Sequence, residues 1–237
     1  MGVKNDKRIV VFIGHFGSGK TECAVNYAMK VKQEMPASKV AIADLDIANP
    51  FFRSREKKDE MEAKGIENLS NLYGKMITDE VPALDPAIRR PLENKEYRAI
   101  VDAGGDPSGA KLLMQFQDLL AVPDCDVFAV VNANRPETAT LEKAVPLLEM
   151  MQITGGLQIT GVVNNTHMIR KTTVKDIMKG YRLAKEVADH FGVPVRYSTC
   201  EEHLLTELNQ QLESTPIESE VFPITLQMRD SYLDKEV

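Results

Sequence analysis

Short, nearly continuous apolar runs alternate along the chain with longer stretches of helical periodicity. The apolar, β-branched runs predict buried strands at 8–14, 39–46, 98–106, 125–138 (ending in a polar loop), 157–167 and 193–199. Between and after them, apolar residues at helical spacing predict helices at 21–35, 109–121, 138–151, 174–192 and 201–212. Apolar strands separated by helices are typical of a parallel sheet covered on both faces. The pattern therefore predicts an α/β fold with a doubly wound, mostly parallel sheet, a Rossmann-like three-layer sandwich.

The stretch 47–97 departs from this alternation. It starts directly after Asp46, carries a charged run at 56–64 that is typical of a solvated helix face, and continues into a proline-bearing segment. We find no internal repeat, so we expect a single domain over 1–237 with an irregular switch or insert region at about 47–97. Within that region, Arg53 and Arg55 could contact a phosphate or an acidic group of a partner, and Phe51 and Phe52 could lie in the core or on a partner surface.

Charge and cysteine usage narrow the class of protein. The formal net charge is −6 over 237 residues, which argues against binding nucleic acid through a concentrated basic face. The chain has no apolar run long enough to span a bilayer. Its three cysteines are far apart and form neither a metal motif nor a disulfide framework. We expect a cytoplasmic protein with neither a nucleic-acid nor a membrane partner.

The octet "GHFGSGKT" follows the first predicted strand and precedes the first predicted helix. It matches the phosphate-loop pattern G-x-x-x-x-G-K-[ST] at every fixed position. In such a loop, backbone N–H groups and the positive end of the helix dipole converge on phosphate, and a lysine adds a mobile charge. The predicted nucleotide-binding residues here are Gly14, His15, Phe16, Gly17, Ser18, Gly19, Lys20, Thr21 and Glu22.

Carboxylates at two other strand ends predict a magnesium site. Asp102 ends the strand in "AIVDAGGD", and with the Thr21 hydroxyl it offers the oxygen ligands that Mg²⁺ prefers. Gly104 lets the backbone approach a γ-phosphate closely. Asp44 and Asp46 form a D-x-D at the end of the second strand, where ligands collect in such sheets.

These motifs in this order resemble the MinD/ParA/CobQ/CobB-like group of P-loop NTPases. The resemblance implies ATP as ligand, Mg²⁺ as cofactor, and catalytic roles for Lys20, Asp46 and Asp102. Asp46 would orient the attacking water and join Thr21 and Asp102 around the metal, with Asp44 as the alternative.

The same resemblance places a second set of residues near the base. Asn164 in "GVVNNTH" stands where such proteins hold an asparagine against the nucleotide, and "VPVRYSTCEE" places Thr199, Cys200 and Glu201 near the purine. The loop "NANRPET" would line the site with Asn134, Arg135 and Pro136. The guanine-reading pattern N-K-x-D is absent, since Asn165 and His167 occupy its lysine and aspartate positions, so adenine is favoured.

One departure from the family pattern affects the expected mechanism. Many MinD and ParA proteins carry a second lysine where this chain has His15, so a dimer that exchanges that lysine is not predicted. The favoured function is a slow ATPase that binds ATP and ADP and switches a protein partner or its own self-association. The alternatives are an ATP-dependent ligase or phosphoryl transferase related to CobB, CobQ and dethiobiotin synthetase, with a second-substrate pocket near 75–95; a metallocentre-assembly NTPase like HypB and UreG; or an ATP-binding module without hydrolysis.

Overall fold

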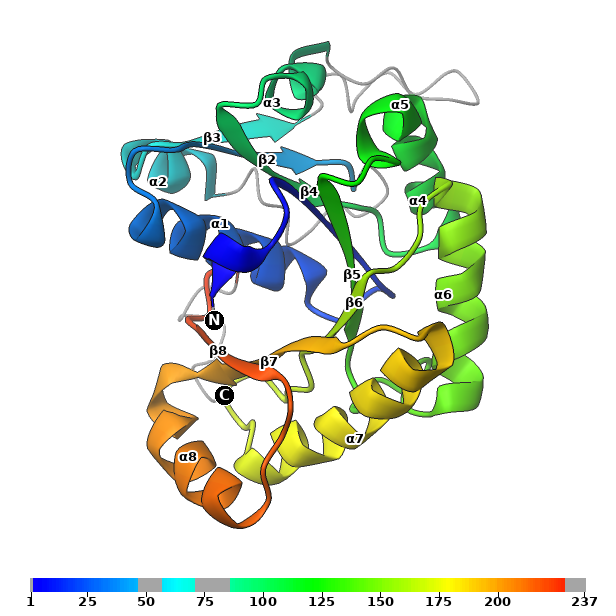
Figure 1. Ribbon diagram of the computed structural model, residues 1–237. Helices are drawn as coiled ribbons and strands as arrows, with labels where there is room; N and C mark the ends of the chain where they lie inside the picture. Colours follow the sequence, from blue (N-terminus) through cyan, green and yellow to red (C-terminus); the bar gives the residue numbers. More distant parts are fainter. Residues whose placement is uncertain (1, 47–56, 71–85, 229–237) are drawn as a thin grey trace, which may run out of the picture.

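The computed structural model describes residues 2–46, 57–70 and 86–228. These residues form an eight-stranded, wholly parallel sheet in the order β3-β2-β4-β1-β5-β6-β7-β8 (Figure 1). The strands are β1 Ile9–Ile13, β2 Lys39–Asp44, β3 Ile66–Ser70, β4 Tyr97–Asp102, β5 Cys125–Val131, β6 Gly161–Asn164, β7 Val195–Glu201 and β8 Glu220–Ile224.

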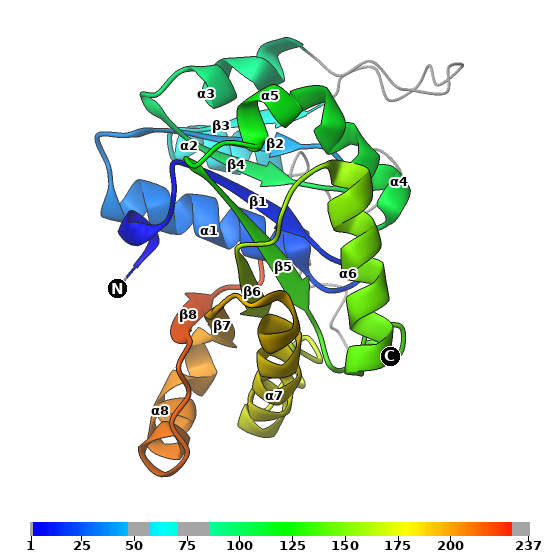
Figure 2. The same cartoon turned by 45° about the vertical axis from the view of Figure 1, so that its right-hand side comes forward.

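Helices connect successive strands and cover both faces of the sheet (Figure 2). The α-helices are α1 Lys20–Glu34, α2 Lys58–Ala63, α3 Arg89–Glu93, α4 Pro107–Ala110, α5 Gln117–Leu120, α6 Leu141–Gly155, α7 Val174–Phe191 and α8 Leu205–Ser214. Short 3₁₀ helices lie at η1 Val3–Asn5, η3 Pro86–Ile88, η4 Lys111–Phe116 and η5 Glu202–Leu204.

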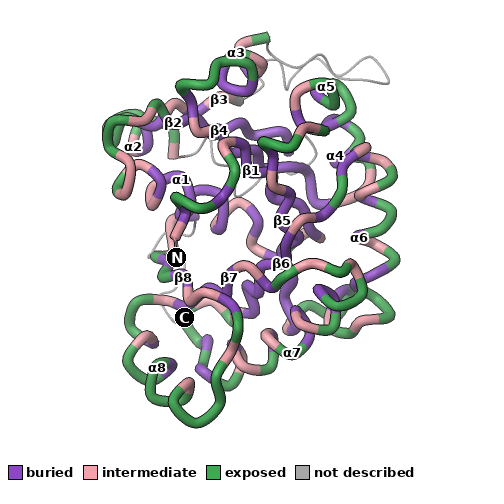
Figure 3. Tube along the Cα trace, in the orientation of Figure 1, coloured by how far each residue is buried: buried purple, intermediate pink, exposed green. Residues whose placement is uncertain are grey.

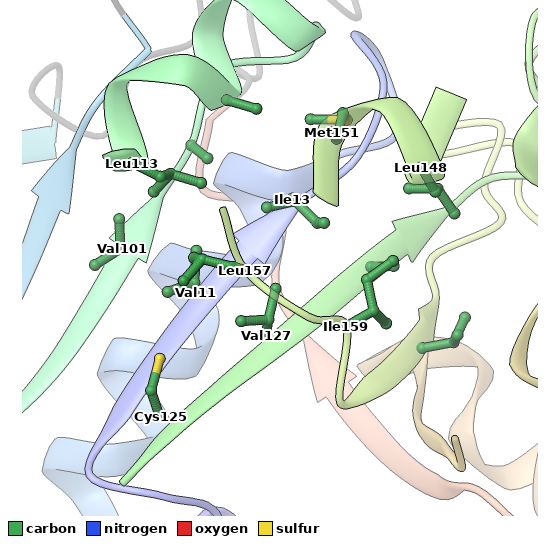
Figure 4. Packing of buried hydrophobic residues seen from close by; sticks show 14 of the residues in the cluster. Val11, Ile13, Val101, Leu113, Cys125, Val127, Leu148, Met151, Leu157 and Ile159 are labelled. Carbon is green, nitrogen blue, oxygen red and sulfur yellow. The ribbon is translucent and has the colours of Figure 1, made fainter. Parts of the chain in front are cut away.

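The central strand β1 shows how the two layers are packed. Ile9, Val11 and Ile13 point into a core shared with α6 and the helical segment after β4 (Figure 4). Val10 and Phe12 point to the opposite face and pack against α1. All five side chains are buried, because both faces of a central parallel strand are covered. The buried strands and exposed outer helix surfaces are evident along the chain trace (Figure 3).

The predicted fold class is confirmed, and so are all six predicted strands. Two further strands, β3 and β8, were not predicted, and both lie at the edges of the sheet. Their sequences, "IENLS" and "EVFPI", lack the continuous apolar run that marks a doubly covered strand. Pro223 has no N–H to donate to a neighbouring strand. It is tolerated in β8 because an edge strand has a neighbour on one side only.

The expectation of an irregular stretch at 47–97 was wrong for its described parts. Residues 57–70 form α2 and β3, and residues 86–97 form η3 and α3 before β4 begins. Phe51, Phe52, Arg53 and Arg55 lie outside the described residues, as does 75–85 of the suggested second-substrate pocket. The single helix expected at 109–121 is instead α4, η4 and α5 in succession.

Capping residues set the two ends of helix α7, and a glycine in its middle lets it pack close to the end of β6. Thr173 and Asp176 form a capping box at its start, and Gly192 ends it in the left-handed region. A Cβ at Gly180 would lie 2.0 Å from Thr166 Oγ1 and 2.3 Å from Asn164 Oδ1. Glycine at this position therefore lets the helix approach the segment after β6.

Candidate functional site

A cavity of about 270 Å³ opens at the carboxyl ends of the strands, where ligands bind in open α/β sheets. Its lining comes from the segments that follow β1, β2, β5 and β6, from the last residues of β7 and β8, and from the segment after β8. The predicted phosphate loop supplies one end of it, through Phe16, Gly17, Gly19, Lys20, Thr21 and Glu22. The cavity thus brings motifs from opposite ends of the sequence into one site.

The phosphate loop has the backbone shape that its glycines predict. Gly17 and Gly19 have φ values of 74° and 83°, in the left-handed region that side-chain-bearing residues rarely adopt. Gly19 is the N-cap of α1, so Lys20 is the first residue of the helix. The N–H of Ser18 donates to the His15 carbonyl at 3.0 Å, which closes the loop over the helix start. The positive end of the α1 dipole consequently faces the cavity.

Thr21 and Asp102 are joined directly at the base of this loop. The Thr21 hydroxyl donates to Asp102 Oδ2 at 2.6 Å, so its lone pairs stay available to a cation. Asp102 is 1% exposed, and its Oδ1 accepts no hydrogen bond within the described part of the chain. Burial raises the pKa of Asp102, and the nearby carboxylates of Asp44 and Asp46 raise it further, against the opposing charge of Lys20.

This donor set fits a divalent cation. Buried carboxylates that raise one another's pKa are stabilised by a cation among them. Among the described residues, no three His, Cys, Asp or Glu side chains form a metal site by themselves. A magnesium ion at Thr21 and Asp102 would therefore take further ligands from phosphate and water, as Mg²⁺ commonly does in nucleotide sites.

The two aspartates after β2 are placed differently. Asp46 lines the cavity, whereas Asp44 Oδ1 accepts the backbone N–H of Asp46 at 3.0 Å. Asp44 therefore shapes the turn that carries Asp46, and Asp46 is the one of the pair in the cavity wall. This arrangement supports the choice of Asp46 over Asp44 for positioning a water molecule.

Of the two adjacent asparagines at the end of β6, the second, Asn165, lies in the cavity wall. Asn165 Nδ2 donates to the carbonyl of Ser18 at 2.7 Å, and its Oδ1 accepts from Thr199 Oγ1 at 2.6 Å. It therefore links the phosphate loop to β7. Asn164 is fully buried, donates to the carbonyl of Ile177, and is absent from the cavity lining. The doubled "NN" indicated a polar strand end, but only the register of β6 decides which asparagine faces the cavity.

His167 lies next to the phosphate loop in the same wall. Its Nδ1 accepts the N–H of Ile169 at 3.2 Å, which leaves the proton of the neutral ring on Nε2. Burial and the charge of Arg135 lower the pKa of His167 from 6.5 to about 4. The ring is therefore neutral near pH 7 and offers an N–H donor.

Thr199, Cys200 and Glu201, at the end of β7, line the cavity at the positions predicted for base contacts. Glu201 Oε1 is buried and accepts no hydrogen bond from a described residue, although Thr172 is near enough to lower the pKa of the carboxyl. Burial is the larger effect and raises that pKa. A buried acceptor at this position suits an N–H group of a ligand.

A further wall of the cavity, which the sequence did not reveal, comes from the segment at and after the end of β8. Ile224, Leu226 and Met228 line the cavity. The segment is tied to α1, because the Glu22 carboxylate accepts the N–H groups of Gln227 and Met228 at 2.6 and 3.1 Å.

A second link to α1 is reciprocal. Asn26 accepts the N–H of Thr225 at 2.9 Å and donates to the Thr225 carbonyl at 3.0 Å. These bonds pair side chains with backbone groups about 200 residues away, so no local pattern could have predicted them.

Eight of the predicted residues are absent from the cavity lining: Gly14, His15, Ser18, Asp102, Gly104, Asn134, Pro136 and Asn164. Gly104 packs against the start of α4, since a Cβ there would lie 2.5 Å from Gly109 Cα. Its neighbour Gly105 accepts the N–H of Phe16 at 3.1 Å, which joins the loop after β4 to the phosphate loop. Asp106, which follows, caps α4 through the N–H of Gly109 at 2.6 Å.

The fold is that of the P-loop NTPases. Three structures of FtsY, each 17% identical in sequence and aligned over 79% of this chain with a TM-score of 0.52, share it. They are the signal recognition particle receptor from Elizabethkingia anophelis in complex with GDP, the chloroplast protein from Physcomitrella patens, and the cell division protein from Thermotoga maritima. The chain spans 55% to 60% of the length of these proteins.

At this level of identity the likeness defines the fold class, which also includes the MinD and ParA proteins, and not a family within it. No protein-family model and no curated protein matches the sequence. None of the helices in residues 2–46, 57–70 and 86–228 is both long and apolar enough to cross a membrane.

Proposed function

We propose that this chain binds Mg·ATP in the cavity and hydrolyses it slowly, as a nucleotide-dependent switch on a protein partner or on its own self-association. The observation that carries the proposal is the Thr21–Asp102 hydrogen bond at the base of a complete phosphate loop. Burial of a carboxylate costs free energy, and a glycine-rich turn that bound neither phosphate nor a cation would gain nothing from Asp102 beneath Thr21.

The roles of the residues follow from their positions. Lys20 and the amides of the loop hold the β- and γ-phosphates, and Thr21 with Asp102 holds the magnesium ion. The bound ion would neutralise phosphate charge. Asp46 orients a water for in-line attack from the cavity wall. Hydrolysis of this kind depends on positioning and electrostatic stabilisation rather than on a covalent intermediate.

Adenine is our choice of base, on two properties of the cavity wall. His167 presents an N–H donor where an aspartate would read guanine, and such a donor cannot accept the N1 and N2 hydrogens of that base. Glu201 supplies a single buried acceptor, which suits the 6-amino group of adenine. Since one FtsY structure of the same fold contains GDP, the guanine nucleotide must be tested on equal terms.

A switch needs a segment that responds to the nucleotide, and the stretch after Asp46 is the candidate. Asp46 lines the cavity, so contacts to the γ-phosphate would act directly on the chain that follows it. We assign the chain to the MinD/ParA-like group within the P-loop fold and to the cytoplasm, as one domain with its switch region at about 47–97.

The test is phosphate release from Mg·ATP and Mg·GTP under identical conditions. We expect slow turnover of ATP that is absent with GTP, absent with EDTA, and lost in Lys20→Ala. Lys175→Ala is the control, since Lys175 is an exposed residue of α7 outside the cavity lining. Turnover of GTP alone would contradict the assignment of the base. Nucleotide binding without turnover would leave a binding module or a ligase that lacks its second substrate.

A further inference from the structure

Arg135, in the loop after β5, lies directly against the phosphate loop. Its Nε donates to the carbonyl of Gly17 at 2.8 Å. A Cβ built on Gly17 would lie 2.7 Å from Arg135 Cζ, so the guanidinium covers the face of Gly17 that a side chain would occupy. Arg135 also lines the cavity. The charged group is therefore held at the phosphate end of the site.

The loop that carries Arg135 is fixed by its own hydrogen bonds. The N–H of Arg135 donates to the Asn132 carbonyl at 3.1 Å, and the Arg135 carbonyl accepts from the N–H of Thr138 at 3.0 Å. Two residues of α7 hold the side chain of Asn134: its Nδ2 donates to Asp176 Oδ1, and its Oδ1 accepts from Lys179 Nζ, both at 2.9 Å. The backbone that carries the Arg135 side chain is therefore fixed, which reduces the entropy lost when Arg135 contacts a ligand.

The charge of Arg135 has no carboxylate partner within the described part of the chain. Several other arginines are paired with one: Arg8 with Asp124, Arg89 with Asp118, and Arg196 with Asp6. Arg135 lines the cavity and uses only Nε in a hydrogen bond that the structure records among the described residues, so its two terminal nitrogens remain available as donors. An arginine whose free donors border a phosphate-binding loop suits bidentate contact with phosphate oxygens.

We propose that Arg135 is a catalytic cation supplied by the same chain, which contacts the phosphates of the bound triphosphate and stabilises the charge that builds up between its β- and γ-phosphates during hydrolysis. This inference rests on the proposed function. His15 does not supply that charge, because it is absent from the cavity lining and its Nδ1 lies 2.8 Å from the Phe16 carbonyl.

A purely structural role for Arg135 predicts a different result. If the guanidinium only supports the loop through the Gly17 carbonyl, its removal would weaken diphosphate and triphosphate binding alike. If it contacts the transferred phosphate, its removal lowers kcat and weakens binding of the triphosphate, while the affinity for the diphosphate stays unchanged. It would also reduce the preference for a non-hydrolysable triphosphate analogue over the diphosphate.

The experiment compares Arg135→Ala and Arg135→Lys with wild type and with Arg182→Ala, which removes an exposed arginine of α7 outside the cavity lining. We expect Arg135→Ala to lower kcat about 100-fold or more, within the range for groups that stabilise transition-state charge. Arg135→Lys should retain part of the rate, since it keeps the charge and loses the fork geometry. Millimolar guanidinium should restore turnover to Arg135→Ala alone.

Three outcomes would overturn the inference: a kcat of Arg135→Ala within twofold of wild type, an equal loss in Arg182→Ala, or no response to guanidinium. If wild type hydrolyses neither ATP nor GTP, the proposed function fails and the binding ratio decides about Arg135. A triphosphate-to-diphosphate affinity ratio that falls tenfold in Arg135→Ala then supports the contact with phosphate, and an unchanged ratio refutes it.

Discussion

The two ends of the cavity are built in contrasting ways. The phosphate end comes mostly from one continuous stretch, Gly14–Thr21, with Asp102 beneath it. The proposed base end is assembled from the segment after β6, the end of β7 and the segment at and after the end of β8, which meet through contacts between residues far apart in sequence. A site whose shape is set by neighbouring residues can be recognised from a motif. A site whose shape is set by packing between distant segments depends on the whole fold.

The largest expected effect lies at the phosphate end. Asp102→Asn should reduce turnover about 100-fold or more, because the metal loses its carboxylate ligand. The same change should leave the unfolding midpoint of the nucleotide-free protein unchanged or raise it, since it removes a buried charge beside Asp44 and Asp46. Thermal unfolding and phosphate release, with the exposed Asp59→Asn as control, check both parts. A fully active Asp102→Asn would refute the proposed metal site.

The next effect concerns the packing that shapes the base end. In Gly180→Ala the new methyl group would lie 2.0 Å from Thr166 Oγ1, so α7 must shift. Strain of this kind costs about 1–3 kcal/mol, which outweighs the gain of about 1 kcal/mol from alanine in a helix. Gly155→Ala in α6 is a matched control, because its closest contact is 3.3 Å. Equal urea midpoints for the two variants would show that α7 tolerates the methyl group without strain.

A smaller effect is expected where the C-terminal wall joins α1. Glu22→Gln retains one acceptor oxygen for the N–H groups of Gln227 and Met228 and loses the charge that strengthens both bonds. We expect nucleotide affinity to fall about tenfold, equivalent to about 1.4 kcal/mol. Hydrogen exchange at those two amides should rise. Glu34→Gln, at the other end of α1, is the control. Unchanged exchange in Glu22→Gln would mean that the wall is held by other contacts.

The smallest effect is a pH dependence. The pKa of His167 falls from 6.5 to about 4 on folding, so the folded state favours the neutral ring. Its contribution to stability is complete above pH 6.5 and is lost as the pH falls through 4. This loss is at most about 3 kcal/mol for a shift of this size, and solvent screening makes it smaller.

His167→Gln should therefore lose less stability than wild type between pH 6.5 and 4. Urea unfolding across that range is the measurement, and His203→Gln, which changes an exposed histidine, is the control. Parallel stability curves for wild type and His167→Gln would contradict the lowered pKa.

The sequence predicted the fold class, the phosphate loop and the position of Asp102 because each depends on local pattern. The edge strand β3 was not predicted, because an edge strand is not buried on all sides and keeps polar residues. One of them is Glu67, which accepts a hydrogen bond from the Tyr97 hydroxyl. Asn165 was overlooked in favour of Asn164, because a change of one residue in the register of β6 reverses which side chain faces the cavity. The roles of Leu226 and Met228 depend on bonds across the whole chain.

The link between Glu22 and the segment after β8 also sets an order of events during synthesis. The phosphate loop leaves the ribosome early, but the N–H of Met228 that Glu22 binds is 206 residues further along. At about 5–20 residues per second, ten seconds or more pass between the synthesis of Glu22 and that of Met228, and the cavity is unfinished during that time. Nucleotide is thus expected to bind tightly only after residue 228 has emerged, so that the switch we propose would not act before the C-terminal wall is in place.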